Sequence, residues 1–125
     1  MAREGHTYTR THKLAGKLLR FDTAAEEAKL AKQAAAAKAG RAAKTFVKEG
    51  RLRVTLMALR KGTVLSAHTV PAEVSIGVVR GAVEVHTEDG AVRANKGSLI
   101  VLQAGVTHDV RALRDSSLLI TTSMR

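Results

Sequence analysis

The segment GTVLSAHTVPAEVSIGVVRG, residues 62–81, decides the fold of this chain. It has a glycine at each end, the only proline of the chain, Pro71, near its middle, and His68 at the end of its first apolar run. A second segment, GSLIVLQAGVTH at residues 97–108, ends on His108. Each segment predicts two short strands joined by a turn, with one buried histidine.

Short strands are also expected on both sides of these segments. Apolar and β-branched runs recur at short intervals and are separated by turns, and Asp89-Gly90 between two such runs is a strong hairpin signal. We expect nine strands, near residues 44–48, 52–60, 63–68, 74–80, 82–87, 91–94, 98–102, 106–111 and 117–123. Nine short strands with regular turns predict a mainly β protein, either a sandwich or a barrel.

The first 40 residues have a different composition. Residues 23–39, TAAEEAKLAKQAAAAKA, are dominated by alanine, the strongest helix former. Thr23 and Glu26 can form a capping box, and Gly40 provides a stop. The apolar face is nearly all alanine apart from Leu30, so we expect this helix to pack loosely or against a second subunit. We therefore divide the chain into a basic N-terminal arm with this helix, residues 1–40, and a β-barrel domain, residues 41–125.

The charge of the chain is uneven. Its 125 residues carry a net charge of +10, and the first 51 hold 12 Lys and Arg against 5 Asp and Glu. Such a region can contact nucleic acid or an anionic membrane surface, or it can be a solvated arm that aids solubility. The chain has no cysteine, which excludes disulfides and thiolate chemistry. It has no apolar run long enough to span a membrane and no apolar signal core, so we expect a cytoplasmic protein.

The spacing of Gly and His in the two segments resembles the two motifs of the cupin superfamily. The first motif is a Gly, five residues, His-x-His, three or four residues, Glu, six residues and Gly. Gly62, His68 and Gly81 match it, whereas Val70 and Val74 stand at the positions of the second His and the Glu.

The second cupin motif is a Gly, five residues, Pro-x-Gly, two residues and His. Gly97, Gly105 and His108 match it, and Gln103 stands at the Pro position. The resemblance covers about residues 44–123 and is to small single-domain bacterial cupin-2 type proteins of unassigned function. It implies a small double-stranded β-helix, or jelly-roll, barrel. It also implies a homodimer, for which the strand near 44–48 and the Ala-rich helix are natural exchange elements.

In typical cupins the two motif-one histidines, the Glu and the last His bind one divalent transition metal inside the barrel. This chain keeps only His68 and His108 as candidate metal ligands, and two imidazoles alone make a weak site. Glu73 is adjacent to the lost Glu position, but strand alternation points it to the other face. His86 is expected on the outer surface for the same reason.

The two histidines leave three alternatives open: a polar pocket for a small ligand, a weak metal site, or packing alone. Met57 and Ser75 are further candidates to line the interior and contact a ligand.

Three functions follow from these alternatives. We expect a non-catalytic module that binds a small molecule in the barrel through His68 and His108. A metal-dependent cupin enzyme, of dioxygenase or isomerase type, would need at least one more metal ligand. An adaptor would bind nucleic acid or an anionic membrane through the basic N-terminal region.

Overall fold

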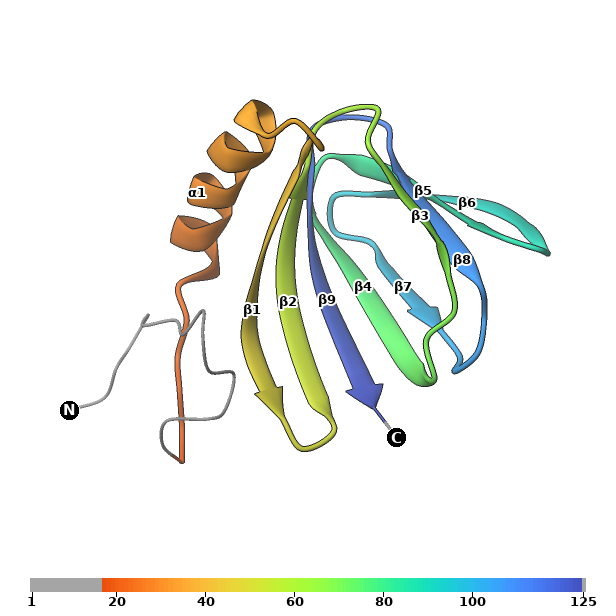
Figure 1. Ribbon diagram of the computed structural model, residues 1–125, viewed down its shortest axis with the longest axis horizontal. Coiled ribbons are helices and arrows are strands. Elements are labelled where there is room, and N and C mark those ends of the chain that lie inside the picture. The colour runs from red at the N-terminus through yellow and green to blue at the C-terminus, as the bar shows by residue number, and fades with distance from the viewer. Residues whose placement is uncertain (1–16, 125) are drawn as a thin grey trace.

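The computed structural model describes residues 17–124, which form one helix and nine strands (Figure 1). The helix is α1 (Thr23–Ala36), and the strands are β1 (Arg41–Glu49), β2 (Leu52–Leu59), β3 (Val64–His68), β4 (Ala72–Arg80), β5 (Ala82–Thr87), β6 (Gly90–Asn95), β7 (Leu99–Leu102), β8 (His108–Ala112) and β9 (Ser116–Met124). This confirms the predicted mainly β fold. Each predicted strand is present, and its ends differ from the prediction by at most three residues.

The strands form two antiparallel sheets that lie face to face (Figure 1). The five-stranded sheet has the order β1-β2-β9-β4-β7, and the four-stranded sheet has the order β3-β8-β5-β6. Apart from the hairpins β1-β2 and β5-β6, neighbouring strands are not consecutive in sequence, as when β9 inserts between β2 and β4. This crossing order places the two glycine-and-histidine segments in both sheets, because each segment contributes one strand to each.

The core between the sheets is built from aliphatic side chains. Alternate residues of each strand point inward. The buried members are Leu59, Val74, Ile76, Val78, Val83, Val85, Ala94, Leu102, Val110, Ala112 and Leu118. None of them is aromatic, which agrees with the scarcity of aromatic residues in the sequence. β-Branched side chains suit this role because they are stiff and fill a pleated surface well.

Helix α1 begins and ends differently from the prediction. Asp22, and not Thr23, is the N-cap, because its carboxylate accepts a hydrogen bond from the backbone N–H of Ala25 at 3.0 Å. The helix ends at Ala36 and not near Gly40. The Arg60 guanidinium donates from Nη1 to the carbonyl oxygens of Ala35 and Ala37, at 3.1 and 3.0 Å. These bonds satisfy carbonyl groups that the helix leaves unpaired at its C-terminal end.

α1 packs on the outer face of its own five-stranded sheet, which corrects the expectation of loose packing (Figure 1). Leu30 and Ala34 of the helix are buried in a second apolar cluster with Phe46, Leu56 and Ala58 of the sheet. Phe21, just before the helix, stacks on Phe46 with ring centroids 4.8 Å apart. The small alanine side chains let the helix approach the sheet closely, and the sheet supplies the large apolar side chains of the cluster.

Two carboxylates, one buried and one partly buried, also hold the helix to the sheet. Glu26 accepts a hydrogen bond from Lys44 Nζ at 3.2 Å. Glu27 Oε2 accepts from Arg80 Nε at 2.8 Å and from Ser117 Oγ at 2.6 Å. Burial alone would raise the pKa of Glu27, but the hydrogen bonds from Ser117 and Arg80 and the charge of Arg80 outweigh it and lower the pKa below 4.5.

Candidate functional site in the barrel

His108 is a buried imidazole at the start of β8. It alternates with Asp109, so it points inward together with Val110, and only 4% of its surface is exposed. Its Nδ1 donates a hydrogen bond to the carbonyl oxygen of Val106 at 3.0 Å. Because a carbonyl can only accept, Nδ1 carries the proton, and in the neutral ring the Nε2 atom has the lone pair. This bond holds the ring in one orientation, with a proton on Nδ1.

His68 is the last residue of β3, and its backbone is the ladder partner of His108. A shift in the register between Leu65 and His68 produces this pairing. The fold thus brings the two motif histidines, 40 positions apart in the sequence, to facing positions of one strand pair. The side chain of His68 lies outside the described part of the structure.

The turns beside the histidines are linked directly. Thr69 follows His68, Thr107 precedes His108, and their hydroxyl groups form a hydrogen bond with each other. The sequence analysis did not single out these threonines. They could have been found from their positions in the sequence, because each is next to a motif histidine. In the structure both lie at the same end of the barrel.

The inner face to which His108 points is otherwise built from apolar side chains. Met57 lies on this face, partly buried against the core, as its strand position predicts. The other partly buried side chains packed against the core are Leu65, Val70, Ile100, Val106 and Ile120. A single fixed imidazole among such side chains suits an apolar ligand with one polar group, and it provides few contacts for a highly polar one.

Ser75 does not line the interior, which corrects our expectation. Its neighbours Val74 and Ile76 are buried in the core between the sheets, so alternation puts Ser75 on the outer face of β4. Glu73 shares that outer set, as predicted. The signal was present in the sequence, since a motif position that faces inward at residue 74 requires residue 75 to face outward.

The donor set does not fit the metal centre of a typical cupin. Val74 occupies the Glu position and is buried in the core, and Val70 occupies the second His position. Alkyl side chains cannot donate to a metal ion. Among the side chains that the structure describes, which do not include that of His68, no three His, Cys, Asp or Glu lie close enough together to hold one. His68 and His108 are the two family ligands that this chain keeps, and valine replaces the other two.

The opposite face of β5 and β8 carries polar groups. His86 bonds to Glu84 there, and it points away from the core as predicted. Asp109 lies beside it, with Arg111 Nε 3.5 Å from its Oδ1. A surface hollow of about 330 Å³ opens at this end of the two strands, lined by His86, Thr87, Glu88, Thr107, His108 and Asp109. His108 therefore lies between the aliphatic core and this surface hollow.

Comparison by sequence finds no related protein: no protein-family model and no curated protein matches the chain. Solved structures do match. A cupin superfamily protein from Desulfitobacterium hafniense superposes with a TM-score of 0.66 at 12% identity, over 68% of this chain and 78% of its own. KdgF from Halomonas sp. superposes with a TM-score of 0.61 at 25% identity, over 68% of this chain and 80% of its own.

A salicylate 1,2-dioxygenase from Pseudaminobacter salicylatoxidans superposes with a TM-score of 0.70 at 17% identity, over 79% of this chain and 33% of the dioxygenase. The chain therefore has the cupin fold, which confirms the resemblance seen in its glycine and histidine spacing. Similarity at this level of identity establishes the fold and leaves the activity open.

Two further expectations concern other parts of the chain. Among the described residues no helix has the length and apolar character needed to cross a membrane. The basic N-terminal arm, residues 1–40, was expected to contact nucleic acid or a membrane in one alternative, and its residues 1–16 lie outside the described residues.

Proposed function

We propose that the protein is a non-catalytic cupin that binds a small, largely apolar molecule inside the barrel through His68 and His108. The observation that carries this proposal is the retention of a fixed, buried imidazole at a cupin ligand position where two other ligand positions hold valine. Burial of an imidazole in an aliphatic core is costly unless its polar atoms are used. Because Nδ1 donates to the Val106 carbonyl, a ligand would meet Nε2 with a hydrogen-bond donor, such as a hydroxyl or an un-ionised acid group.

A ligand titration followed through the imidazole tests this proposal. Wild-type protein is titrated with a panel of small organic acids that includes salicylate, and the ring signals of His108 are followed by NMR. We expect saturable shifts with at least one acid, and affinity about tenfold weaker in His108→Gln, because the hydrogen bond between the imidazole and the ligand is lost. His86→Gln, which changes the histidine on the outer face, is the matched control and should bind as wild type does.

Two results would contradict this proposal. Either no acid in the panel gives a saturable shift, or His108→Gln binds as tightly as wild type. Thermal denaturation of His108→Gln distinguishes a lost contact from a lost fold, since the glutamine amide can still donate to the Val106 carbonyl.

The metal-dependent alternative predicts a different measurement. Elemental analysis of protein purified without an affinity tag should find transition metal far below one ion per chain, because the carboxylate and one imidazole of the family site are absent. Stoichiometric, tightly bound metal would contradict the proposal of a metal-free binding protein and favour a cupin enzyme. Loss of a detected activity in both His68→Ala and His108→Ala would then assign that activity to this site.

We also propose that the protein forms a homodimer, through the outer face of β4 and β7 and not through strand exchange. β1, the expected exchange element, pairs along its whole length with β2 of the same chain. Leu99 and Val101 on β7 are 65% and 66% exposed, and Val79 on β4 is exposed beside them. Small residues, Ser75 and Gly77, lie between these side chains and β9.

A second copy is the occupant favoured by the charge of this face. The chain carries a net charge of +10, so most pairs of identical surfaces would place like charges opposite each other. The residues named above have no charge, and a two-fold axis through them avoids this repulsion. In sedimentation experiments we expect a dimer for wild type and for Val92→Glu, on exposed β6, and a monomer for Val101→Glu. Monomeric wild type, or equal behaviour of the two variants, would contradict the proposed interface.

A further inference from the structure

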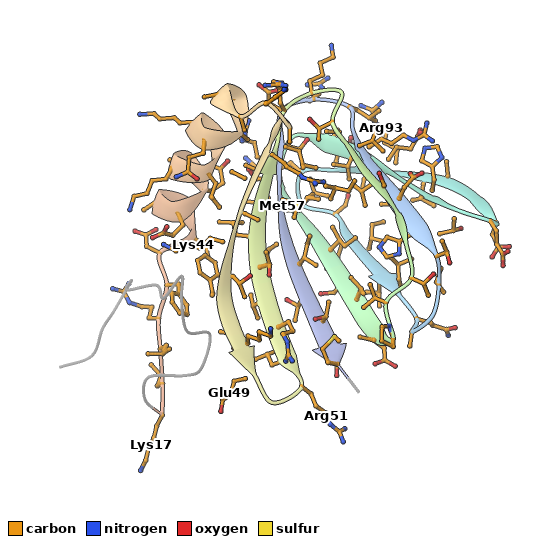
Figure 2. The ribbon with its side chains drawn as sticks, in the orientation of Figure 1. Lys17, Lys44, Glu49, Arg51, Met57 and Arg93 are labelled. Atoms are coloured by element: carbon orange, nitrogen blue, oxygen red, sulfur yellow. The ribbon has the colours of Figure 1, made fainter. Side chains whose placement is uncertain are left out.

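A second hollow lies at the end of the barrel away from the histidines. It has a volume of about 330 Å³ and is lined by Gly81, Ala82, Arg93, Asn95, Lys96 and Arg114. Strand β4 runs between the two ends, from Ala72 near His68 to Arg80 next to Gly81, a length of about 25 Å. Figure 2 shows Arg93 at this end and Arg51 at the other. Half of the lining residues are cations, and none is an acid.

The backbone around this hollow is fixed by close contacts. Gly81 has φ +82, and a Cβ there would collide with the carbonyl of Asp115 and the hydroxyl of Ser116. The buried Ser116 Oγ also donates to the carbonyl of Arg114 at 2.8 Å and contacts Ala82. The turn that carries Arg114 is therefore locked against the turn between β4 and β5.

The turn that carries Lys96 is held in the same way. The Lys96 backbone N–H donates to the carbonyl of Gly81 at 3.0 Å, and Asn95 pairs with Ala82 in the β5–β6 ladder. Arg93, two residues earlier on the same face of β6, donates from Nε to Asn95 Oδ1 at 3.1 Å. This bond directs the guanidinium along the strand toward the hollow and uses only one of its donors.

The three cations are not neutralised by carboxylates. Among the described side chains, Arg93, Lys96 and Arg114 form no ion pair. Glu84 is the ladder partner of Arg93, but its carboxylate bonds to His86. Asp115 adjoins Arg114, but its Oδ1 accepts the backbone N–H of Lys61 at 2.8 Å. Three positive charges from separate strands and turns thus surround one hollow, with the guanidinium groups able to donate in pairs.

We propose that this hollow binds a small phosphorylated anion, with Arg93, Lys96 and Arg114 as its ligands. Guanidinium groups match the geometry of phosphate oxygens, and an ammonium group adds a point charge. The volume suits a compact ligand with two or three phosphate groups. The lining has no aromatic side chain on which a base could stack, which disfavours single-stranded nucleic acid.

Calorimetric titration with inorganic tripolyphosphate tests the site. We expect one tripolyphosphate per chain, and Kd weaker by about tenfold or more in Arg93→Gln and in Arg114→Gln, because each loses charge-assisted hydrogen bonds. Arg93→Lys should also weaken binding, since it keeps the charge and loses the paired donors. Arg51→Gln removes the same charge at the far end of the molecule and should change Kd less than twofold or so.

The outcomes separate this site from general charge and from the barrel site. Equal weakening by Arg51→Gln, several tripolyphosphates per chain, or no binding at physiological ionic strength would overturn the proposal. Salt-dependent binding of duplex DNA that is lost in Arg93→Gln and Arg114→Gln, without tripolyphosphate binding, would replace the small anion with nucleic acid. His108→Gln should leave tripolyphosphate binding unchanged, so failure at one site does not imply failure at the other.

Discussion

The two halves of the outer face of the five-stranded sheet have similar backbones and different covers. Over β1 and β2, the side chains of Phe46, Leu56 and Ala58 are buried beneath α1. Over β4 and β7, Leu99 and Val101 are exposed. The difference shows that this chain uses its helix to bury only half of an apolar sheet face. Apolar area removed from water contributes to stability within the chain, whereas the exposed half can contribute only when something else covers it.

The largest expected effect comes from the covered half. Leu56→Ala should lower the free energy of unfolding by about 3 kcal/mol, because a side chain that is 1% exposed leaves a cavity under α1. Leu52→Ala is the matched control: it lies on the same strand and the same face but is 44% exposed, and it should cost less than about 1 kcal/mol. Urea denaturation measures both. Equal losses would show that α1 does not protect this half in solution.

A smaller effect is expected from the polar contact between the helix and the sheet. Glu27→Gln should lower the free energy of unfolding at neutral pH by about 1–2 kcal/mol, because Ser117 and the partly exposed Arg80 lose a charged acceptor. Glu49→Gln, at the exposed end of β1, removes the same charge and should have little effect. If Glu49→Gln is as destabilising as Glu27→Gln, the overall charge of the chain matters more than this contact.

The same carboxylate gives a pH dependence with a definite sign. The pKa of Glu27 is lowered in the folded protein, so its contribution is fully present above the ordinary value of 4.5 and is lost as the pH falls through the lower folded value. Wild type should therefore lose more stability than Glu27→Gln on acidification below pH 4.5. Urea denaturation of both proteins at neutral and acidic pH measures the difference. Parallel curves would exclude a lowered pKa.

The sequence predicted the barrel because the signals for it are local. Gly81 has a positive φ and lies so close to Asp115 that any other residue would collide there. Alternation along each strand determines which residues face the core. The placement of Val74 in the core follows from the same rule. The backbone pairing of His68 with His108 was not predicted, because the spacing of the motifs does not specify the register shift that achieves it.

The sequence predicted the helix ends and the cationic hollow poorly because those features depend on distant residues. α1 ends where Arg60, 25 positions beyond Ala35, reaches its carbonyl groups, and no local pattern specifies that contact. The hollow combines β6 with turns that meet only after both sheets have formed. Nothing in the neighbourhood of Arg114 distinguishes it from the other basic residues until the turn of Gly81 packs against it.

The smallest expected effect comes from the exposed half of the sheet face. It tests directly whether a second copy covers this half. At dilutions where the chain is a monomer, Leu99→Thr should change the free energy of unfolding by less than about 0.5 kcal/mol, since the leucine contacts mostly water. Leu102→Thr, on the buried face of the same strand, should cost several times more. At higher concentrations wild type gains stability from association, whereas Leu99→Thr gains less. A Leu99→Thr effect that is independent of protein concentration would mean that no second copy covers this half.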